Sequence, residues 1–309
     1  MIRSFILKKF LKIFFTGLLS VLLAVVIVLA ANTFWYYPHY KDNKSVAQIN
    51  AENTESIKMM SYNLRCISPT DFGKKSWFYR ADLIVDDIEN EKPGIIGFQE
   101  ATKWHYSYLQ ETFPQYDSVI TYRDEAFNSE GCPIFYNKNL YTLVDKGSFW
   151  LSETPEVMSK SWGAQYNRVC SYVILTDNAT GNDFVVFNTH LSHVSDEARI
   201  NGIKVVLDKI AEFGSLPAVI MGDFNAEEGS ETYVKVTENF DDARYRTEKT
   251  SDSHTYQGWG NPEKYKIIDY FMISKEGFTV NEYSVLSGLH DGVYSSDHCP
   301  IALEVKLEK

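Results

Sequence analysis

The chain has 309 residues and a mass of 35.5 kDa, with 44% apolar and 23% charged residues. This composition excludes a disordered or fibrous protein and provides enough apolar material for a large core. The formal net charge of −11 is divided unevenly: residues 1–44 hold six Lys or Arg and one acid, which leaves 24 bases and 40 acids, net −16, in the rest. Tight non-specific binding to nucleic acid is therefore not expected, because such binding depends on basic side chains that neutralise phosphates.

The N-terminal segment is predicted to enter a membrane. Nineteen uncharged residues run from Ile13 to Ala31, about the number that a helix needs to cross the hydrocarbon layer. Basic residues precede this run and four aromatic residues follow it at 34–37, the pattern of a cytoplasmic flank and an interfacial belt. We expect a basic cytoplasmic flank at 1–12, a transmembrane signal anchor at 13–34 and an extracytoplasmic body. The alternative is a cleaved signal peptide.

Residues 37–56 are polar and lack periodicity, which predicts a linker, and one domain is expected at 57–309. The four cysteines show no metal-binding spacing, so most are expected to be buried and apolar in character. A disulfide between Cys132 and Cys170 is conceivable outside the cytoplasm.

Short apolar runs with β-branched or aromatic residues predict eight strands in the domain. These runs are 58–62, 94–98, 133–136, 171–175, 184–187, 218–221, 267–273 and 301–305. The clearest helix is 195–213, where Ile203, Val206, Leu207 and Ile210 recur at helical spacing. Weaker helical patterns occupy 79–91 and 102–112. The expected fold class is α/β, with two sheets packed face to face and helices on the outside.

Polar residues fall where several predicted strands give way to loops. They are Asn63, Glu100, His190, Asp223 and Asn225. Any one of them reads as an ordinary turn residue. Strand ends can converge on one rim, however, and such a rim would combine oxygen ligands for a cation with groups that transfer protons. Asp269 inside an apolar run, and Asp297 with His298 before the last strand, extend the same set.

Six segments, in this order, resemble the endonuclease/exonuclease/phosphatase superfamily. They are SYNLR at 61–65, FQE at 98–100, FNTHL at 187–191, MGDFN at 221–225, IDYF at 268–271 and SDHCPI at 296–301. FWLSETP at 149–155 and NTHLSH at 188–193 further resemble its bacterial, deadenylase-like branch. The resemblance covers nearly all of 57–309 and implies a four-layer α-β-β-α sandwich of two mixed sheets flanked by helices.

The resemblance also implies roles for the rim residues in phosphoester hydrolysis. Glu100, Asp297 and Asn63 would hold Mg²⁺, or Mn²⁺ in its place, since a divalent cation neutralises phosphoryl oxygens. His298 resembles the general base, and Asp269 would accept its second ring proton.

Three further residues are expected at the phosphate by the same resemblance. His190 would bind a phosphate oxygen or assist the leaving group, Asn225 would orient the phosphate beside Asp223, and Asp223 would assist proton transfer or a second metal. Arg168 would contact the scissile phosphate through its planar fork, with a surface ion pair as the alternative.

Other polar residues carry weaker expectations. Glu130 either orients His190 or is solvated. A substrate contact by His193 is in doubt, because Ser192 stands where relatives carry an Asp. Tyr256 and Trp259 either shape the substrate cleft or pack within their loop.

The function that these observations favour is a membrane-anchored, divalent-metal-dependent phosphoesterase acting on phosphodiester bonds. Nucleic acid, phospholipid headgroups and small phosphoesters are its candidate substrates. The competing hypothesis is a catalytically silent module tethered to the membrane. The intact residue set argues against that hypothesis.

Overall fold

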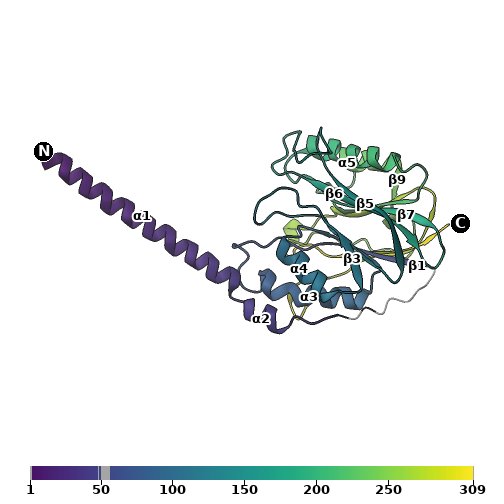
Figure 1. Ribbon diagram of the computed structural model, residues 1–309, viewed down its shortest axis with the longest axis horizontal. Coiled ribbons are helices and arrows are strands. Elements are labelled where there is room, and N and C mark those ends of the chain that lie inside the picture. The colour runs from purple at the N-terminus through teal and green to yellow at the C-terminus, as the bar shows by residue number, and fades with distance from the viewer. Residues whose placement is uncertain (1, 48, 50–55, 309) are drawn as a thin grey trace.

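The computed structural model describes residues 2–47, 49 and 56–308. A long helix, α1 (Ile2–Phe34), projects from a layered body, and the short helix α2 (Tyr37–Asp42) lies against that body. Figure 1 shows α1 leaving on the side opposite the C-terminus. The body contains two six-stranded sheets and a small hairpin of β12 (Leu289–His290) with β13 (Val293–Tyr294).

The first sheet has the strand order β11-β14-β1-β2-β4-β3. Its members are β1 (Ser56–Asn63), β2 (Ile95–Gln99), β3 (Tyr116–Val119), β4 (Ile134–Asn137), β11 (Phe278–Val285) and β14 (Ile301–Leu307). Strands β1 and β2 are parallel, whereas β14 runs antiparallel to β1. The sheet is therefore mixed.

The second sheet has the order β5-β6-β7-β8-β10-β9. Its members are β5 (Tyr141–Trp150), β6 (Val169–Asp177), β7 (Asp183–His190), β8 (Ala218–Asp223), β9 (Phe240–Asp242) and β10 (Asp269–Ser274). Here β7 and β8 are parallel and place His190 opposite Asp223. Strand β10 is antiparallel to β8 and places Asp269 opposite Asp223.

Helices cover the outer faces of both sheets. The first sheet carries α3 (Trp77–Glu91) and α4 (Lys103–Thr112), and the second carries α5 (Asp196–Ala211) and α6 (Glu231–Thr237). Three single 3₁₀ turns complete the elements: η1 (Gly73–Lys75), η2 (Ala243–Tyr245) and η3 (Pro262–Lys264). One apolar cluster fills the space between the sheets, and two others lie beneath the helices. The four-layer α-β-β-α prediction is confirmed.

Local sequence explains where these elements form. All eight predicted runs are strands, since each supplies buried apolar side chains to a sheet. Helix α5 begins where Ser195 accepts a hydrogen bond from the Ala198 N–H, and α3 ends at Lys92 in a left-handed conformation. Strands β5 and β11 were not predicted, because exposed polar residues interrupt their apolar positions.

Helix α2 falls inside the stretch predicted as a linker. Tyr36 and Tyr40 pack on the apolar cluster beneath α3 and α4, and Ala47 and Ile49 are buried in it. The Asn43 side chain donates a hydrogen bond to Asp82 on α3. Described residues of this stretch therefore contact the domain, although their sequence shows no periodicity.

The candidate disulfide between Cys132 and Cys170 does not form. Cys132 and Cys170 are both buried, and all four cysteines, which lie in the described part of the chain, are free thiols. Burial raises the pKa of Cys132 to about 12. Both side chains therefore pack in the protein interior as small apolar groups, as expected for most of the cysteines.

Candidate active site

Strand direction brings the predicted polar residues to one edge of the sandwich. Parallel strands β1 and β2 end at Asn63 and Gln99, and parallel strands β7 and β8 end at His190 and Asp223. Side chains at these ends meet across the two sheets: the Asn63 Nδ2 atom donates to Asp223 Oδ2 over 3.0 Å. The edge is therefore built by both sheets.

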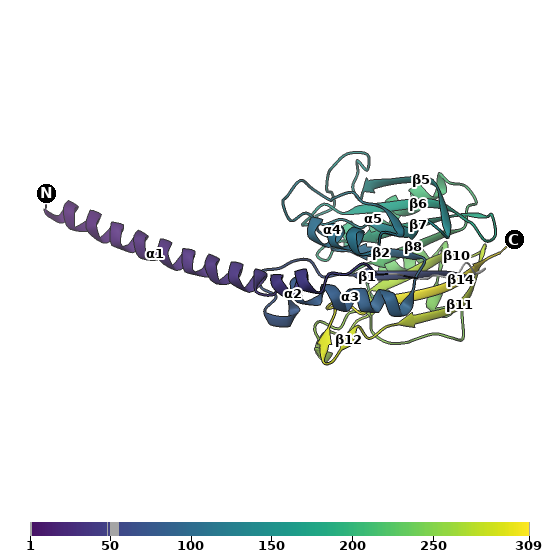
Figure 2. The same ribbon diagram turned by 60° about the horizontal axis from the view of Figure 1, so that its bottom comes forward.

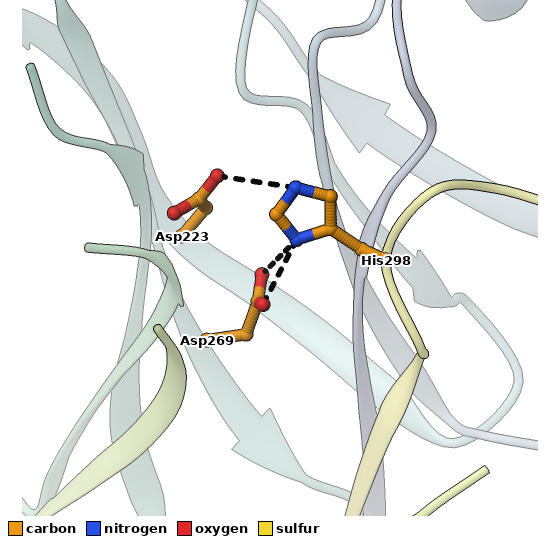
Figure 3. Close-up of side chains that lie close together, drawn as sticks. All are labelled: Asp223, Asp269 and His298. Carbon is orange, nitrogen blue, oxygen red and sulfur yellow. Dashed lines mark hydrogen bonds and ion pairs between the residues drawn. The ribbon is translucent and has the colours of Figure 1, made fainter. Parts of the chain in front are cut away.

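Asp223, Asp269 and His298 form a buried cluster at this edge (Figure 3). His298 Nδ1 lies 2.9 Å from Asp269 Oδ2, and His298 Nε2 lies 3.7 Å from Asp223 Oδ2. The Thr255 hydroxyl donates to Asp269 Oδ2 over 2.7 Å. Asp269 therefore fixes one ring nitrogen of His298 and leaves the other facing Asp223.

Electrostatics in this cluster favour a proton on the imidazole. Burial lowers the pKa of His298, but the carboxylates of Asp269 and Asp223 outweigh it and raise that pKa to about 10. Burial and the neighbouring charge of Asp269 raise the pKa of Asp223 to about 7. Of the two groups, His298 is thus the stronger base and holds the proton near neutral pH, while the raised pKa of Asp223 leaves that carboxylate able to accept one as well.

Glu100 and Asp297 form a second acidic group beside Asn63. Burial opposes ionisation of Glu100, but the Cys66 N–H, which donates to Oε2 over 2.6 Å, and the charge of Arg65 lower its pKa. Asn63 Nδ2 lies 3.5 Å from Glu100 Oε1. Glu100 itself adopts a left-handed backbone, with φ of 58°.

Two observations bear on where a cation fits. Asp297 is buried, and its Oδ1 atom has no hydrogen-bond partner among residues 2–47, 49 and 56–308. An unsatisfied buried carboxylate oxygen next to an ionised Glu suits a hard divalent cation. Ligand atoms of Asp223, Asp269 and His298 also lie within 4.8 Å of one another, so proximity alone would allow a cation there.

The remaining predicted residues surround the same edge. His190 Nε2 lies 3.4 Å from Asp223 Oδ2, and burial with the charge of Arg168 holds its pKa well below the usual value. The Asn225 side chain donates to the Leu191 carbonyl over 3.2 Å, and its backbone N–H donates to Asp223 Oδ1 over 2.8 Å. Arg168 Nη2 lies 3.0 Å from His193 Nδ1.

These side chains open into a cleft of about 940 Å³. Seven of the nine predicted site residues line it: Glu100, Arg168, His190, Asp223, Asn225, Asp297 and His298. Asn63 and Asp269 do not line the cleft themselves, but they contact lining residues: Asn63 bonds to Asp223 and Asp269 to His298. The structure thus brings all nine together, while their individual roles stay predictions.

Several secondary expectations are resolved by contacts. Glu130 accepts a 2.7 Å hydrogen bond from Arg123, so its side-chain partner is that arginine and not His190. His193 lines the cleft, and Tyr256 packs against the His298 ring with centroids 4.8 Å apart. Trp259 lies instead over the guanidinium of Arg80.

Two residues of the site went unassigned in the sequence. Arg65 makes a two-pronged ion pair with Asp71, over 3.0 and 3.1 Å, and its Nη1 atom lies 4.0 Å from Asp297. Thr255 holds Asp269 in place. Arg65 stands in the SYNLR motif, a signal that could have identified it, whereas Thr255 has no local pattern of its own.

Comparisons with known proteins agree with this geometry. Residues 60–298 match the Endonuclease/Exonuclease/phosphatase family. A solved protein of that family from Bacteroides vulgatus is 29% identical, with a TM-score of 0.77 over 82% of this chain and 99% of the other. The mannosyl-6-phosphatase of Bacteroides thetaiotaomicron is also 29% identical, with a TM-score of 0.74 over 81% and 99%.

Curated relatives match a smaller part of the chain. An uncharacterized protein of Acanthamoeba polyphaga mimivirus is 32% identical over 162 residues, which are 49% of this chain and 60% of that protein. Nocturnin of Drosophila melanogaster is 27% identical over 176 residues, 52% of this chain and 26% of its own length. The chain therefore spans less than two thirds of either relative.

Proposed function

This chain belongs to the endonuclease/exonuclease/phosphatase family, and we propose from that premise that it is a membrane-anchored, divalent-metal-dependent phosphodiesterase. The family match and the buried Asp/His cluster support a phosphoesterase of this family. The observation that supports metal dependence is the acidic group of Glu100, whose pKa is lowered, and buried Asp297, whose Oδ1 atom has no hydrogen-bond partner among the described residues, beside the His298 cluster.

Glu100, Asp297 and Asn63 are the residues that would hold the cation. We prefer them to the Asp223, Asp269 and His298 group because hydrogen bonds already occupy His298 Nδ1 and the Asp269 carboxylate. Mg²⁺, or Mn²⁺, would neutralise the phosphoryl oxygens and the departing alkoxide. Asp71 supports this site by orienting Arg65 toward Asp297.

The other side chains bind the phosphate and move protons. In its neutral form His298, held at Nδ1 by Asp269, would take a proton from the attacking water at Nε2, and Asp223 would share that transfer at Oδ2. Arg168, His190 and Asn225 face the same cleft and would contact the phosphate oxygens. Water adds to phosphorus, one ester P–O bond breaks, and the alcohol leaves with a proton.

The membrane anchor in this proposal is α1. This helix, near the N-terminus, is long and apolar enough to cross a membrane. The most apolar part of it is not buried in the protein. The lysines and arginine before the apolar run favour a cytoplasmic N-terminus and an extracytoplasmic domain. Recovery of the full-length, 35.5 kDa chain in the membrane fraction would support retention of α1, whereas a shortened N-terminus would support a cleaved signal peptide.

The test is hydrolysis of bis(p-nitrophenyl) phosphate by the full chain in detergent, with and without Mg²⁺. We expect His298→Ala to lower the rate by about 10²- to 10⁴-fold, the usual contribution of a general base. Glu100→Gln should abolish Mg²⁺ binding in calorimetry as well as turnover. Glu276→Gln, the same chemical change at an exposed position, is the matched control.

A second candidate activity is hydrolysis of phosphomonoesters. The match to a mannosyl-6-phosphatase over nearly its whole length favours it. Parallel assays with p-nitrophenyl phosphate separate the two activities, because preference for the monoester would direct the substrate search to sugar phosphates. A chain that cleaves neither ester and binds no Mg²⁺ would instead be a silent, membrane-tethered module.

A further inference from the structure

The cleft lies on the edge of the body that faces the anchor helix. Figures 1 and 2 both show the C-terminus on the side opposite α1. Strand β14 ends at Leu307 beside that terminus, so its start at Ile301, just after Asp297 and His298, lies at the edge nearer α1. Strand β1, antiparallel to β14, ends at the same edge with Asn63.

The end of α1 is bonded directly to the loop that lines the cleft. Asn32 Nδ2 donates to the carbonyl oxygens of Pro69 and Asp71 over 3.2 and 3.3 Å. The Ser76 hydroxyl donates to the Thr33 carbonyl over 3.2 Å. Pro69 itself lines the cleft. The anchor is therefore held against the active-site loop through several contacts.

A short series of contacts continues from the anchor to a candidate metal ligand. The backbone of Asp71 accepts from Asn32, while its carboxylate accepts both hydrogen bonds of Arg65. Arg65 Nη1 in turn lies 4.0 Å from Asp297 Oδ2. Two residues, Asp71 and Arg65, thus separate the anchor from the acidic pair that would hold the cation.

The length of the apolar run determines where the contacts of Asn32 and Thr33 would lie relative to the bilayer. Residues 13–31 are uncharged, and a helix of that length spans about 30 Å, the thickness of the hydrocarbon layer. Asn32 and Thr33 follow immediately, at the level of the headgroups. Because Asn32 bonds to Pro69 and Asp71, the active-site loop lies at that level too.

Exposed apolar side chains stand on the loops around the cleft. We call Phe72, Phe127 and Val194 the apolar rim; their exposed fractions are 57%, 83% and 51%. Phe72 follows Asp71, Phe127 lies between the lining residues Ala126 and Asn128, and Val194 follows the lining residue His193. Three large apolar side chains are thus exposed on loops that border one cleft, and on a membrane-anchored protein such side chains can be buried by contact with an apolar surface.

We propose that the apolar rim rests on the bilayer that α1 crosses, so that the substrate is a phosphodiester in the headgroup of a membrane lipid. This inference rests on the proposed phosphodiesterase activity and names its substrate. Water adds to the headgroup phosphorus, one of its two ester P–O bonds breaks, and the released alcohol takes the proton. The products are a phosphomonoester and an alcohol, one of which stays in the bilayer.

The experiment uses the full chain reconstituted in vesicles of phosphatidylcholine, phosphatidylethanolamine and phosphatidylglycerol in equal parts. Phosphorus NMR follows cleavage of any headgroup with Mg²⁺ present, and bis(p-nitrophenyl) phosphate reports the soluble reaction in the same sample. The test variant is the double substitution Phe72→Ser and Phe127→Ser. Val144→Ser, at an exposed position on β5, is the matched control.

We expect the wild type to cleave vesicle lipid and the double variant to do so at least about fivefold more slowly, because two apolar side chains no longer enter the bilayer. Both should cleave the soluble ester equally, as should the control. Cleavage of the soluble ester with intact vesicle lipid, an unchanged lipid rate in the double variant, or preference for added RNA would each overturn the inference and leave the phosphodiesterase standing. If the soluble ester also stays intact, the proposed function itself fails.

Discussion

At the scale of single residues, Asp269 shows how a carboxylate is kept inside an apolar strand. It is 2% exposed, and a buried charge without partners would be costly. His298 Nδ1 lies 2.9 Å from Asp269 Oδ2, and the Thr255 hydroxyl donates to that same oxygen over 2.7 Å. The same Thr255 oxygen accepts from the N–H groups of Ile268 and Asp269, each over 3.0 Å. Thr255 is therefore a positioning residue for the His298 cluster.

Thr255→Val should uncouple Asp269 from this support. The loss of one hydrogen bond and the two unpaired backbone N–H groups should cost about 1–3 kcal/mol of unfolding free energy. We expect kcat to fall about tenfold with little change in KM, since the imidazole loses its fixed orientation while phosphate contacts persist. Thr255→Ser keeps the hydroxyl and should restore both quantities, measured by steady-state kinetics and urea unfolding. Equal losses in the two variants would contradict the role.

His290 provides a pH-dependent contribution to stability away from the cleft. Its Nε2 atom lies 2.9 Å from Asp87 Oδ1, and this hydrogen bond raises the pKa of His290 in the folded state. The protonated form is thus favoured by folding, so the extra stability is complete below the unfolded pKa of about 6.5 and disappears as pH rises through the folded value.

We therefore expect His290→Gln to lower the unfolding free energy by about 1 kcal/mol below that pH and by less at higher pH. Urea unfolding across a pH series measures the difference between the two proteins. A difference that stays constant with pH would show that the hydrogen bond acts without the charge.

The residues that could be predicted from sequence are those whose side chains interrupt an apolar pattern. Asp269 and Asp223 stand out because a carboxylate at a strand end needs an explanation, and family motifs then group them. Arg65 and Thr255 were not assigned, because their importance comes from partners such as Asp71 and Asp269 that only the fold brings near. For Glu130, the sequence suggested His190 as a partner, but the fold places Arg123 against its carboxylate.

At the scale of elements, the meeting of β7 and β8 depends on one glycine. Gly222 has φ of 139°, and a Cβ atom there would lie 1.9 Å from the Thr189 carbonyl oxygen on β7. No side chain fits between the two strands at this point. The close approach places His190 beside Asp223 in register, which the cluster requires.

Gly222→Ala should separate the strands or leave the chain strained. We expect a loss of at least about 3 kcal/mol of unfolding free energy, the range of severe overpacking, together with most of the activity. Gly229→Ala tests an exposed loop glycine whose added Cβ would meet nothing within 4 Å. It should keep activity, although its own positive φ of 80° costs some stability. Thermal unfolding and turnover of both variants make the comparison.

Elements were predictable where apolar residues alone define them. Strands β1, β2, β7 and β8 are buried on both faces, so their runs are continuous and easily recognised. Strand β5 lies at a sheet edge, with many exposed residues and a bulge between Leu143 and Asp145. Its sequence therefore has no apolar run that would predict a strand. Hydrogen bonding to β6 holds β5 in the sheet, although its own sequence does not predict a strand.

At the scale of the whole molecule, the anchor and the domain are joined by packed aromatic residues. Tyr40 of α2 lies against Phe78 and Tyr108, with ring centroids 5.3 and 4.9 Å apart. Burial raises the pKa of Tyr40 to about 12, consistent with a ring half-buried against the domain. Trp35, five residues earlier and just before α2, is 73% exposed. The stretch predicted to be a linker thus contains a segment that packs on the domain, and the contribution of this segment to stability can be measured.

Tyr40→Ala should destabilise the domain itself. Truncating a half-buried aromatic that contacts four rings should cost about 2–3 kcal/mol, less than a fully buried ring because one side already meets water. Trp35→Ala removes a larger but exposed ring and should change the unfolding free energy by no more than about 0.5 kcal/mol in detergent. Guanidinium unfolding of the full chain measures both. If the two variants unfold alike, α2 only tethers the domain, and the cleft is then free to turn away from the bilayer.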